Sequence, residues 1–270
     1  MRVRRAILAV VTTLWAAGCA DRLANADHLA APAGLVRREV STATFRLTTY
    51  SRDRDTAAPV VVYIEGDGLA WKSRSEPSAD PTPAEAMGLR LAALDPSPNV
   101  LYLARPCQFT RNDSRCAQTY WTDRRFAEEV VTGMNQAIDL AARGRRLHLV
   151  GYSGGGAIAA LIAARRNDVA SLRTVAGNLD HDAVNRFHDV SPMRGSLNAI
   201  NLAAGLATLP QEHFVGGADE VVPAFVAEAF VRAVGNGDCA KVVRVEGATH
   251  TDGWANAWRI NAARVPTCRR

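Results

Sequence analysis

The sequence predicts one α/β domain, in which a mainly parallel, twisted β-sheet carries helices on both faces. Three observations favour this fold class. The chain has 270 residues, of which 48% are hydrophobic, and this is enough to bury a large core. Short continuous apolar runs recur along it, as is typical of strands buried on both sides. Segments with apolar residues at helical spacing separate these runs, and such alternation predicts a parallel sheet.

The strands are expected at the apolar and β-branched runs. Residues 36–42 and 44–50 predict an opening pair of strands with a tight connection. Residues 59–64 form a continuous apolar run that ends in Glu65-Gly-Asp-Gly68, which predicts a strand buried on both faces. Parallel sheets place their sites at the carboxyl ends of the strands, so the loops that follow such runs are candidates for chemistry. The same pattern recurs at residues 99–103, 146–150, 172–176, 213–215 and 241–245.

The helices are expected between these strands. Residues 82–94 predict the first. Apolar residues at helical spacing over residues 126–138 indicate the second, with Thr122 or Asp123 as its cap and Gly144 as its end. Further helices are predicted over residues 155–166, 223–234 and 253–263.

The first residues resemble a bacterial lipoprotein leader. Basic residues precede an apolar stretch over residues 6–17, and Gly18-Cys19 follows it. In the lipobox that this order resembles, the cysteine carries the lipid and becomes the new N-terminus. We therefore expect a signal peptide over residues 1–18, a lipid-anchored tether over residues 19–34 and the folded domain over residues 35–270.

The leader also predicts the location of the protein. Ala20, rather than Asp, follows Cys19, and this favours the periplasmic face of the outer membrane. Ala16 departs from the resemblance, because such boxes usually carry leucine there. Cleavage by ordinary signal peptidase is therefore the alternative, and it yields a soluble periplasmic or secreted protein. Either route takes the chain out of the cytoplasm.

The cysteine count agrees with export. Once Cys19 is set aside for lipid, an even number remains, which suggests two disulfides in an oxidising compartment. Three connectivities are open. The local pairing closes the shortest loops and is the one we favour, joining Cys107 to Cys116 and Cys239 to Cys268.

Composition excludes several function classes. The formal net charge is +5, but Arg2, Arg4 and Arg5 lie in the leader and the rest of the chain is close to neutral. This balance predicts neither a nucleic acid nor an acidic partner. Outside the leader no long apolar run indicates a membrane span. No cysteine and histidine spacing indicates zinc, and we expect neither a metal nor a cofactor.

One strand end carries a motif whose spacing reflects the backbone geometry of a sharp turn. The run that ends at Val150 continues into Gly151-Tyr-Ser153-Gly-Gly155, and an Ala-rich helical segment follows at once. A nucleophile on a sharp turn from strand to helix has a strained backbone, and residues two positions away on each side must be glycine-sized. The helix N-terminus below Ser153 also favours developing negative charge. Placement between a buried strand and a helix makes Ser153 a candidate nucleophile.

With the residues that follow it, this motif resembles the α/β-hydrolase superfamily, whose triad runs in the order nucleophile, acid, histidine. The family often carries its acid in a Gly-x-x-Asp-x-x-Val-Pro loop after a later strand, and residues 216–223 reproduce that loop around Asp219. The histidine follows the last strand, as His250 does. The resemblance covers about residues 35–265 and implies a triad of Ser153, Asp219 and His250.

The same resemblance implies an oxyanion hole. Its first donor is the backbone N–H of Gly154, which follows the nucleophile. The second donor comes from the loop at residues 65–68, and we expect the N–H of Asp67, with Gly66 as the fallback. Glu65 stands where many relatives have histidine, and this does not affect a backbone donor. A carboxylate beside an oxyanion is repulsive, so the Asp67 side chain is expected to point away.

Two alternatives to this site remain open. Asp180 follows another strand end, where some relatives carry their acid, although it lacks the loop signature of Asp219. His181 and His188, each beside an aspartate, suggest a metal cluster, against which stands the commoner explanation of charged residues on a surface helix.

The resemblance implies a serine hydrolase that cleaves carboxylic esters through an acyl-serine intermediate. Its substrate would be a small-molecule, lipid or polymer ester. A peptidase or amidase with the same triad is the second possibility, since the chemistry acts on both kinds of acyl bond. A lipid-tethered binding module on an inactive hydrolase scaffold is the third. The sequence does not specify an oligomeric state.

Overall fold

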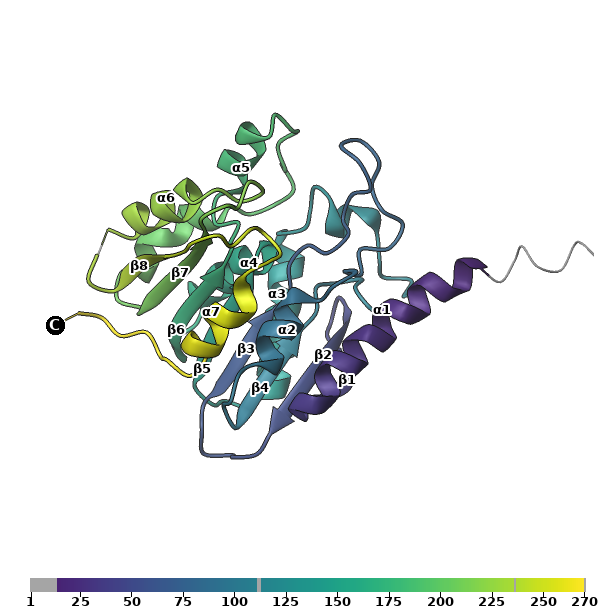
Figure 1. The fold of residues 1–270 in the computed structure, drawn as a ribbon, viewed down its shortest axis with the longest axis horizontal. Helices are drawn as coiled ribbons and strands as arrows, with labels where there is room; N and C mark the ends of the chain where they lie inside the picture. The colour runs from purple at the N-terminus through teal and green to yellow at the C-terminus, as the bar shows by residue number, and fades with distance from the viewer. Residues whose placement is uncertain (1–13, 111–112, 236, 270) are drawn as a thin grey trace, which may run out of the picture.

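The computed structural model describes residues 14–110, 113–235 and 237–269, with side chains from Arg22 onward. The predicted signal peptide therefore lies largely outside the described residues, and so does the side chain of Cys19. Within the described residues eight strands form one sheet (Figure 1). The strands are β1 (Val36–Ser41), β2 (Arg46–Asp53), β3 (Val60–Ile64), β4 (Asn99–Leu103), β5 (Leu147–Tyr152), β6 (Val169–Val175), β7 (Gln211–Gly216) and β8 (Ala240–Val245).

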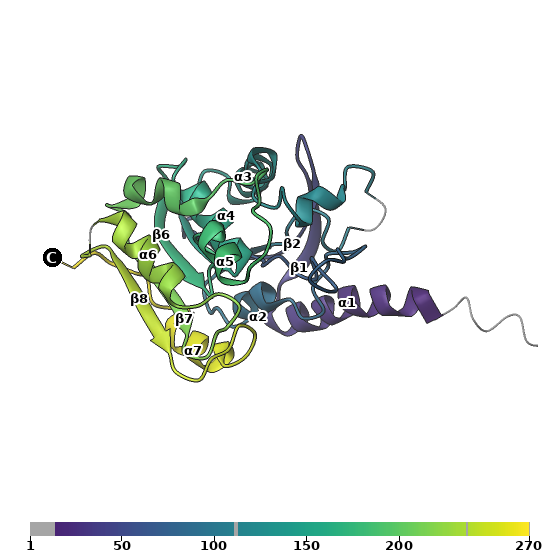
Figure 2. The same cartoon turned by 90° about the horizontal axis from the view of Figure 1, so that it is seen from above.

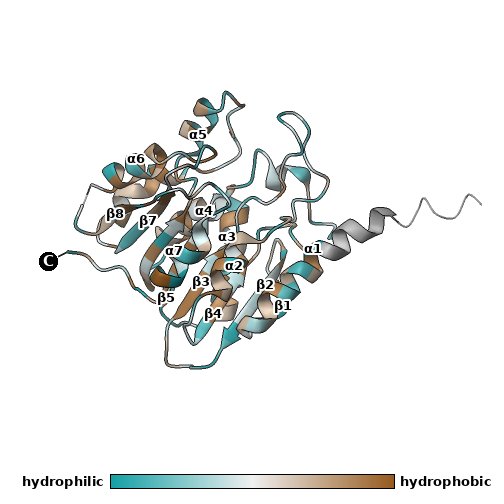
Figure 3. Cartoon of the chain, in the orientation of Figure 1, coloured by the Kyte–Doolittle hydropathy of each residue, from teal (hydrophilic) through white to brown (hydrophobic). Residues whose placement is uncertain are grey.

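The strand order confirms the predicted fold class. The sheet runs β1-β2-β4-β3-β5-β6-β7-β8. β2 pairs antiparallel with both β1 and β4, and all the other neighbours are parallel. Each predicted strand is present, and the fully buried β3 is among the hydrophobic segments of Figure 3. The carboxyl ends of β5, β7 and β8 consequently lie at one edge of the sheet.

Helices cover both faces of this sheet, as predicted (Figure 2). α1 (Leu14–Ala30), α2 (Met87–Ala93) and α7 (Trp254–Asn261) lie on one face. α3 (Glu128–Ala142), α4 (Gly154–Ala163) and α6 (Phe225–Val234) lie on the other, where they form the larger core with the sheet. The remaining helical segments are α5 (His181–Phe187) and the 3-10 turns η1 (Ala31–Ala33), η2 (Gln118–Trp121) and η3 (Ala199–Leu206).

Two predicted helices begin later than expected. α2 starts at Met87 rather than at residue 82, because prolines alternate with other residues just before it and disfavour the helical backbone there. Thr82 instead accepts a hydrogen bond from the N–H of Phe109 at 2.9 Å. α3 starts at Glu128 rather than after Thr122 or Asp123. The segment before it is the η2 turn and a loop, not a first helical turn.

In the segment expected to be a tether, α1 contributes side chains to the core. Ala26 and Ala30 of α1 are 3% and 1% exposed and pack in the core beside α2. Asp27 accepts a hydrogen bond from the Tyr50 hydroxyl at 2.8 Å and lies 3.0 Å from the Arg37 Nε atom. Alanine side chains are small enough to let a helix approach the sheet closely. This part of residues 19–34 is therefore a packed helix and not an extended linker.

Both favoured disulfides are present, one joining Cys107 to Cys116 and the other joining Cys239 to Cys268. The first ties the loop after β4 to the segment before η2. The second ties the start of β8 to the segment that follows α7. In the described residues no helix is both long and apolar enough to cross a membrane.

Candidate active site

Ser153 lies on a sharp turn between β5 and α4. Its backbone has φ +50° and ψ −122°, a conformation that side-chain-bearing residues rarely adopt and that is typical of functional turns. The flanking glycines are sterically required. A Cβ at Gly151 would lie 2.3 Å from the Gly155 carbonyl oxygen, and one at Gly155 would lie 2.3 Å from the Ile64 carbonyl oxygen. The predicted steric reason for the Gly-x-Ser-x-Gly spacing is present.

His250 and Asp219 meet Ser153 at this edge of the sheet. His250 Nε2 lies 3.0 Å from Ser153 Oγ, and His250 Nδ1 lies 2.9 Å from Asp219 Oδ2. The second oxygen of Asp219 accepts the backbone N–H groups of Val221 and Val222, each at 2.9 Å. The Asp219 side chain is completely buried and that of His250 is 15% exposed. The three predicted residues thus form one continuous chain of hydrogen bonds.

Neighbouring aromatic residues hold the backbone of the histidine. The Tyr152 hydroxyl and the Trp254 indole N–H both donate to the His250 carbonyl oxygen at 3.0 Å. The Tyr152 ring also lies 5.5 Å from the His250 ring, centroid to centroid. An imidazole fixed in this way can take a proton from a serine hydroxyl while a buried carboxylate stabilises its charged form.

The loop after β3 lies beside the nucleophile. The N–H of Gly66 donates to Glu65 Oε1 at 2.9 Å, so this group is already engaged. In the described part of the chain, the N–H groups of Asp67 and Gly154 have no hydrogen-bond acceptor. These two groups are the donors that the sequence favoured for an oxyanion hole, and Gly66 is the less suitable fallback.

Glu65 has a structural role that sequence reasoning missed. Its buried carboxylate accepts the N–H groups of Gly88 at 3.0 Å and Leu89 at 3.4 Å, and the Tyr102 hydroxyl at 3.0 Å. Burial raises the pKa of Glu65 in spite of these hydrogen bonds. The side chain therefore connects the end of β3 to the first turn of α2.

Asp67 belongs to a buried ion cluster that was also missed. Its carboxylate bridges Arg105 and Arg125, with N–O distances of 3.0 and 2.7 Å. Burial by itself raises the pKa of Asp67, but the charges of Arg125 and Arg105 outweigh it and hold that pKa below its usual range. The carboxylate lies against Gly154, and its charge is offset by the two guanidinium groups.

Asp180 contacts residues other than Ser153 and His250. Its Oδ1 atom accepts the Ala183 N–H at 3.1 Å and the Asn198 side-chain N–H at 2.7 Å, so it caps α5. His181 is 3% exposed and its ring stacks on that of Phe126. Across the ranges that the structure describes, no group of three or more histidine, cysteine, aspartate or glutamate residues is arranged to hold a metal ion.

Comparison with solved structures identifies the fold. Est1E from Butyrivibrio proteoclasticus is similar over 84% of this chain and 95% of its own, with a TM-score of 0.58 and 15% sequence identity. The Pyrococcus furiosus esterase Pf2001 covers 85% and 91%, with a TM-score of 0.59 and 11% identity. A membrane phospholipase A described as a bacterial virulence factor covers 88% and 87%, with a TM-score of 0.54 and 18% identity.

No protein-family model matches the sequence, and neither does any curated protein. The class is therefore defined by the structure: the chain has the α/β-hydrolase fold, with an eight-stranded, mostly parallel sheet in its described residues. At such low identities the likeness establishes the fold alone, and the chemistry rests on the geometry of the site.

Proposed function

We propose that the protein is a serine hydrolase that cleaves carboxylic esters, with Ser153 as nucleophile, His250 as general base and Asp219 as the acid. The observation that carries this proposal is the unbroken chain of hydrogen bonds from Ser153 through His250 to the buried Asp219, at 3.0 and 2.9 Å. Ser153 also has a strained backbone with a positive φ, and such strain is concentrated at functional sites.

The geometry supports a two-step reaction. Ser153 Oγ attacks the acyl carbon while His250 Nε2 takes the hydroxyl proton, and the N–H groups of Gly154 and Asp67 stabilise the oxyanion. Collapse of the intermediate breaks the bond to the alcohol, which leaves with the proton from His250. Water then attacks the acyl-serine in the same manner, releases the carboxylic acid and restores Ser153.

Support for an ester substrate comes from the similar folds. Two of the comparison proteins are an esterase and a phospholipase A by their own descriptions. The same triad can act on amides, so a peptidase or amidase is an outcome that experiment must distinguish. A binding module without catalysis is the other alternative. The contacts among Ser153, His250 and Asp219 argue against it.

The test is covalent labelling with a fluorophosphonate, followed by a panel of esters and amides. We expect wild-type protein to be labelled at Ser153 only, to hydrolyse esters faster than the matched amides, and to lose both labelling and turnover in Ser153→Ala. The exposed Ser191→Ala variant is the matched control and should behave as wild type. Turnover that persists in Ser153→Ala overturns the mechanism, and an unlabelled wild type favours the binding module.

We also propose that Cys19 carries the lipid that anchors the enzyme at a membrane. The leader supports this, and the two disulfides favour a compartment outside the cytoplasm. Mass spectrometry of the N-terminal peptide of the mature protein should find a diacylglycerol-modified Cys19, and Cys19→Ser should move the protein to the soluble fraction. A soluble wild-type protein with an unmodified N-terminus near residue 20 contradicts the proposal.

A further inference from the structure

The elbow contains a glycine that the turn itself does not require. The steric rule needs small residues at Gly151 and Gly155, but the residue directly after the nucleophile is also glycine. A Cβ at Gly154 would lie 2.1 Å from Asp67 Oδ1 and 2.6 Å from Asp67 Cγ. The carboxylate of Asp67 therefore occupies the space that a side chain at position 154 would fill.

Two arginines hold this carboxylate in place. Each oxygen binds a different guanidinium group, Oδ1 that of Arg105 and Oδ2 that of Arg125. Arg105 is only 4% exposed, and it also donates to the Arg125 carbonyl oxygen. Both guanidinium groups lie over the Phe126 ring, 5.3 and 5.9 Å from its centroid. The position of the Asp67 carboxylate is thus determined from two sides.

The backbone of the same loop is fixed by two further side chains. The Gln108 side-chain N–H donates to the Gly66 carbonyl oxygen at 2.9 Å, while its own oxygen accepts the Arg105 N–H at 3.0 Å. Glu65 accepts the Gly66 N–H on the other side. These bonds hold the loop without using the N–H of Asp67, which has no hydrogen-bond acceptor in the described residues.

We propose that the Asp67 carboxylate, seated on Gly154 and held by Arg105 and Arg125, is a positioning group that fixes the two oxyanion donors relative to each other. This inference rests on the proposed hydrolase function. The donors belong to separate elements, the loop after β3 and the first turn of α4, and the carboxylate is in contact with both. Preorganised donors stabilise developing charge without reorganisation.

The first test removes the carboxylate and keeps the backbone N–H. We expect Asp67→Ala and Asp67→Asn to lower kcat by about 10²-fold, the loss typical of a misplaced oxyanion donor, with KM changed by less than about threefold. The rate of fluorophosphonate labelling should fall in parallel. A wild-type kcat in both variants, each shown by circular dichroism to be folded, overturns the proposal.

The second test uses the contact between Asp67 and Gly154. Gly154→Ala should lower kcat strongly in the wild-type background, because its Cβ displaces the carboxylate. In the Asp67→Ala background the same substitution should cost less than about fivefold, because the space is then empty. This non-additivity is the signature of two groups in contact. Equal losses in the two backgrounds overturn the proposal, since they show that Gly154 is needed for another reason.

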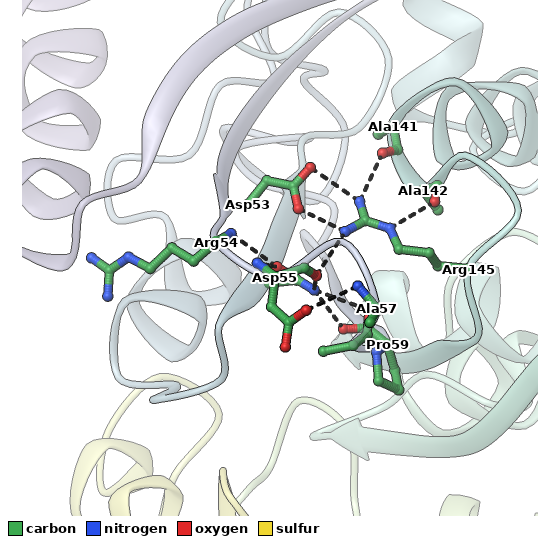
Figure 4. Close-up of polar contacts among 10 residues, drawn as sticks. Asp53, Arg54, Asp55, Ala57, Pro59, Ala141, Ala142 and Arg145 are labelled. Carbon is green, nitrogen blue, oxygen red and sulfur yellow. Dashed lines mark hydrogen bonds and ion pairs between the residues drawn. The ribbon is translucent and has the colours of Figure 1, made fainter.

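An ion pair far from the site, with a more exposed carboxylate than that of Asp67, provides the control (Figure 4). Asp53 accepts two hydrogen bonds from the Arg145 guanidinium at 2.6 and 3.2 Å, next to the first residue of β4 and hence at the opposite edge of the sheet. Asp53→Asn should leave kcat unchanged. If it lowers kcat as much as Asp67→Asn does, the effect is one of general stability and the proposal fails. If the proposed hydrolase function is itself wrong, wild-type Ser153 is not labelled by the fluorophosphonate, and this outcome differs from a failure of the positioning proposal.

Discussion

The two candidate acids differ in which groups surround their carboxylates. One oxygen of Asp219 is saturated by two backbone N–H groups, which leaves the other free to face His250. The Asp180 carboxylate instead accepts hydrogen bonds from the N–H of Ala183, in its own helix, and from the side chain of Asn198. Asp219 can thus orient an imidazole, whereas Asp180 stabilises the start of α5.

This difference predicts unequal effects of removing each charge. Asp219→Asn should lower kcat by about 10⁴-fold, because the imidazole is then held in the wrong tautomer. Asp180→Asn should keep most of the activity and cost only the stability of a helix cap, about 1 kcal/mol. Steady-state kinetics on both variants, each checked for folding by its thermal transition, measures the ranking. The reverse order of kcat values moves the acid to Asp180.

Sequence reasoning singled out Ser153, His250 and Asp219, which the structure brings together, but not the ion cluster beside them. Ser153 and Asp219 stand in local motifs whose spacing reflects backbone geometry, so a single stretch of sequence indicates them. Arg105 and Arg125 lie 38 and 58 positions from Asp67, and their pairing depends on how three loops meet. The one local signal was Gly154, a glycine that the elbow does not need and that only its neighbour in space explains.

At the scale of elements, strands were easier to predict than helix ends. A strand buried on both faces must be apolar throughout, so β3 and β4 are visible as runs in the sequence. Helix starts depend instead on which backbone groups find other partners, and the loop before α2 bonds to Phe109 rather than to itself. α5 was considered only as a surface helix around His181 and His188, without bounds, because it is a seven-residue helix whose start is set by a single cap.

The opening helix shows how composition can mislead. The alanine-rich stretch before Leu35 has few large apolar residues, and it was interpreted as a linker. Because small residues permit close approach, α1 packs on the sheet instead, and Asp27 secures it to Tyr50. If Cys19 carries lipid, the attachment point then lies at most a few residues from the first packed turn, and the domain is held close to the membrane surface.

At the scale of the whole molecule, one buried histidine couples stability to pH. His213 of β7 is 0% exposed, with Nδ1 2.9 Å from Thr174 Oγ1 and its ring against Phe230. Its Nε2 atom has no hydrogen-bond partner in the described residues. Burial lowers the pKa of His213 to about 3, so the folded protein keeps this ring neutral where the unfolded chain would protonate it.

The sign of the pH effect follows from that pKa. The histidine pKa is lower in the folded state than the ordinary value of about 6.5, so its contribution is fully present above pH 6.5 and is lost as pH falls toward 3. We expect the free energy of unfolding to fall by about 2 kcal/mol between pH 7.5 and pH 5 from this group alone. Urea unfolding at a series of pH values measures it.

A matched pair of variants isolates this contribution. His213→Gln should flatten the dependence of unfolding free energy on pH between 7.5 and 5, whatever its effect on absolute stability. The exposed His28→Gln should keep the wild-type slope. An unchanged slope in His213→Gln would show that other groups carry the acid sensitivity.

The disulfide between Cys239 and Cys268 spans 29 positions, and His250 lies between its two ends. The disulfide therefore closes β8, the loop with His250 and α7 into a covalent ring. Arg173 adds hydrogen bonds to carbonyl groups at the last residue of α7 and just after it. A single proteolytic cut anywhere within this ring leaves both fragments joined through sulfur. The fragment that carries His250 therefore remains attached to the one that carries Ser153, and a nicked molecule keeps both residues in one covalent unit.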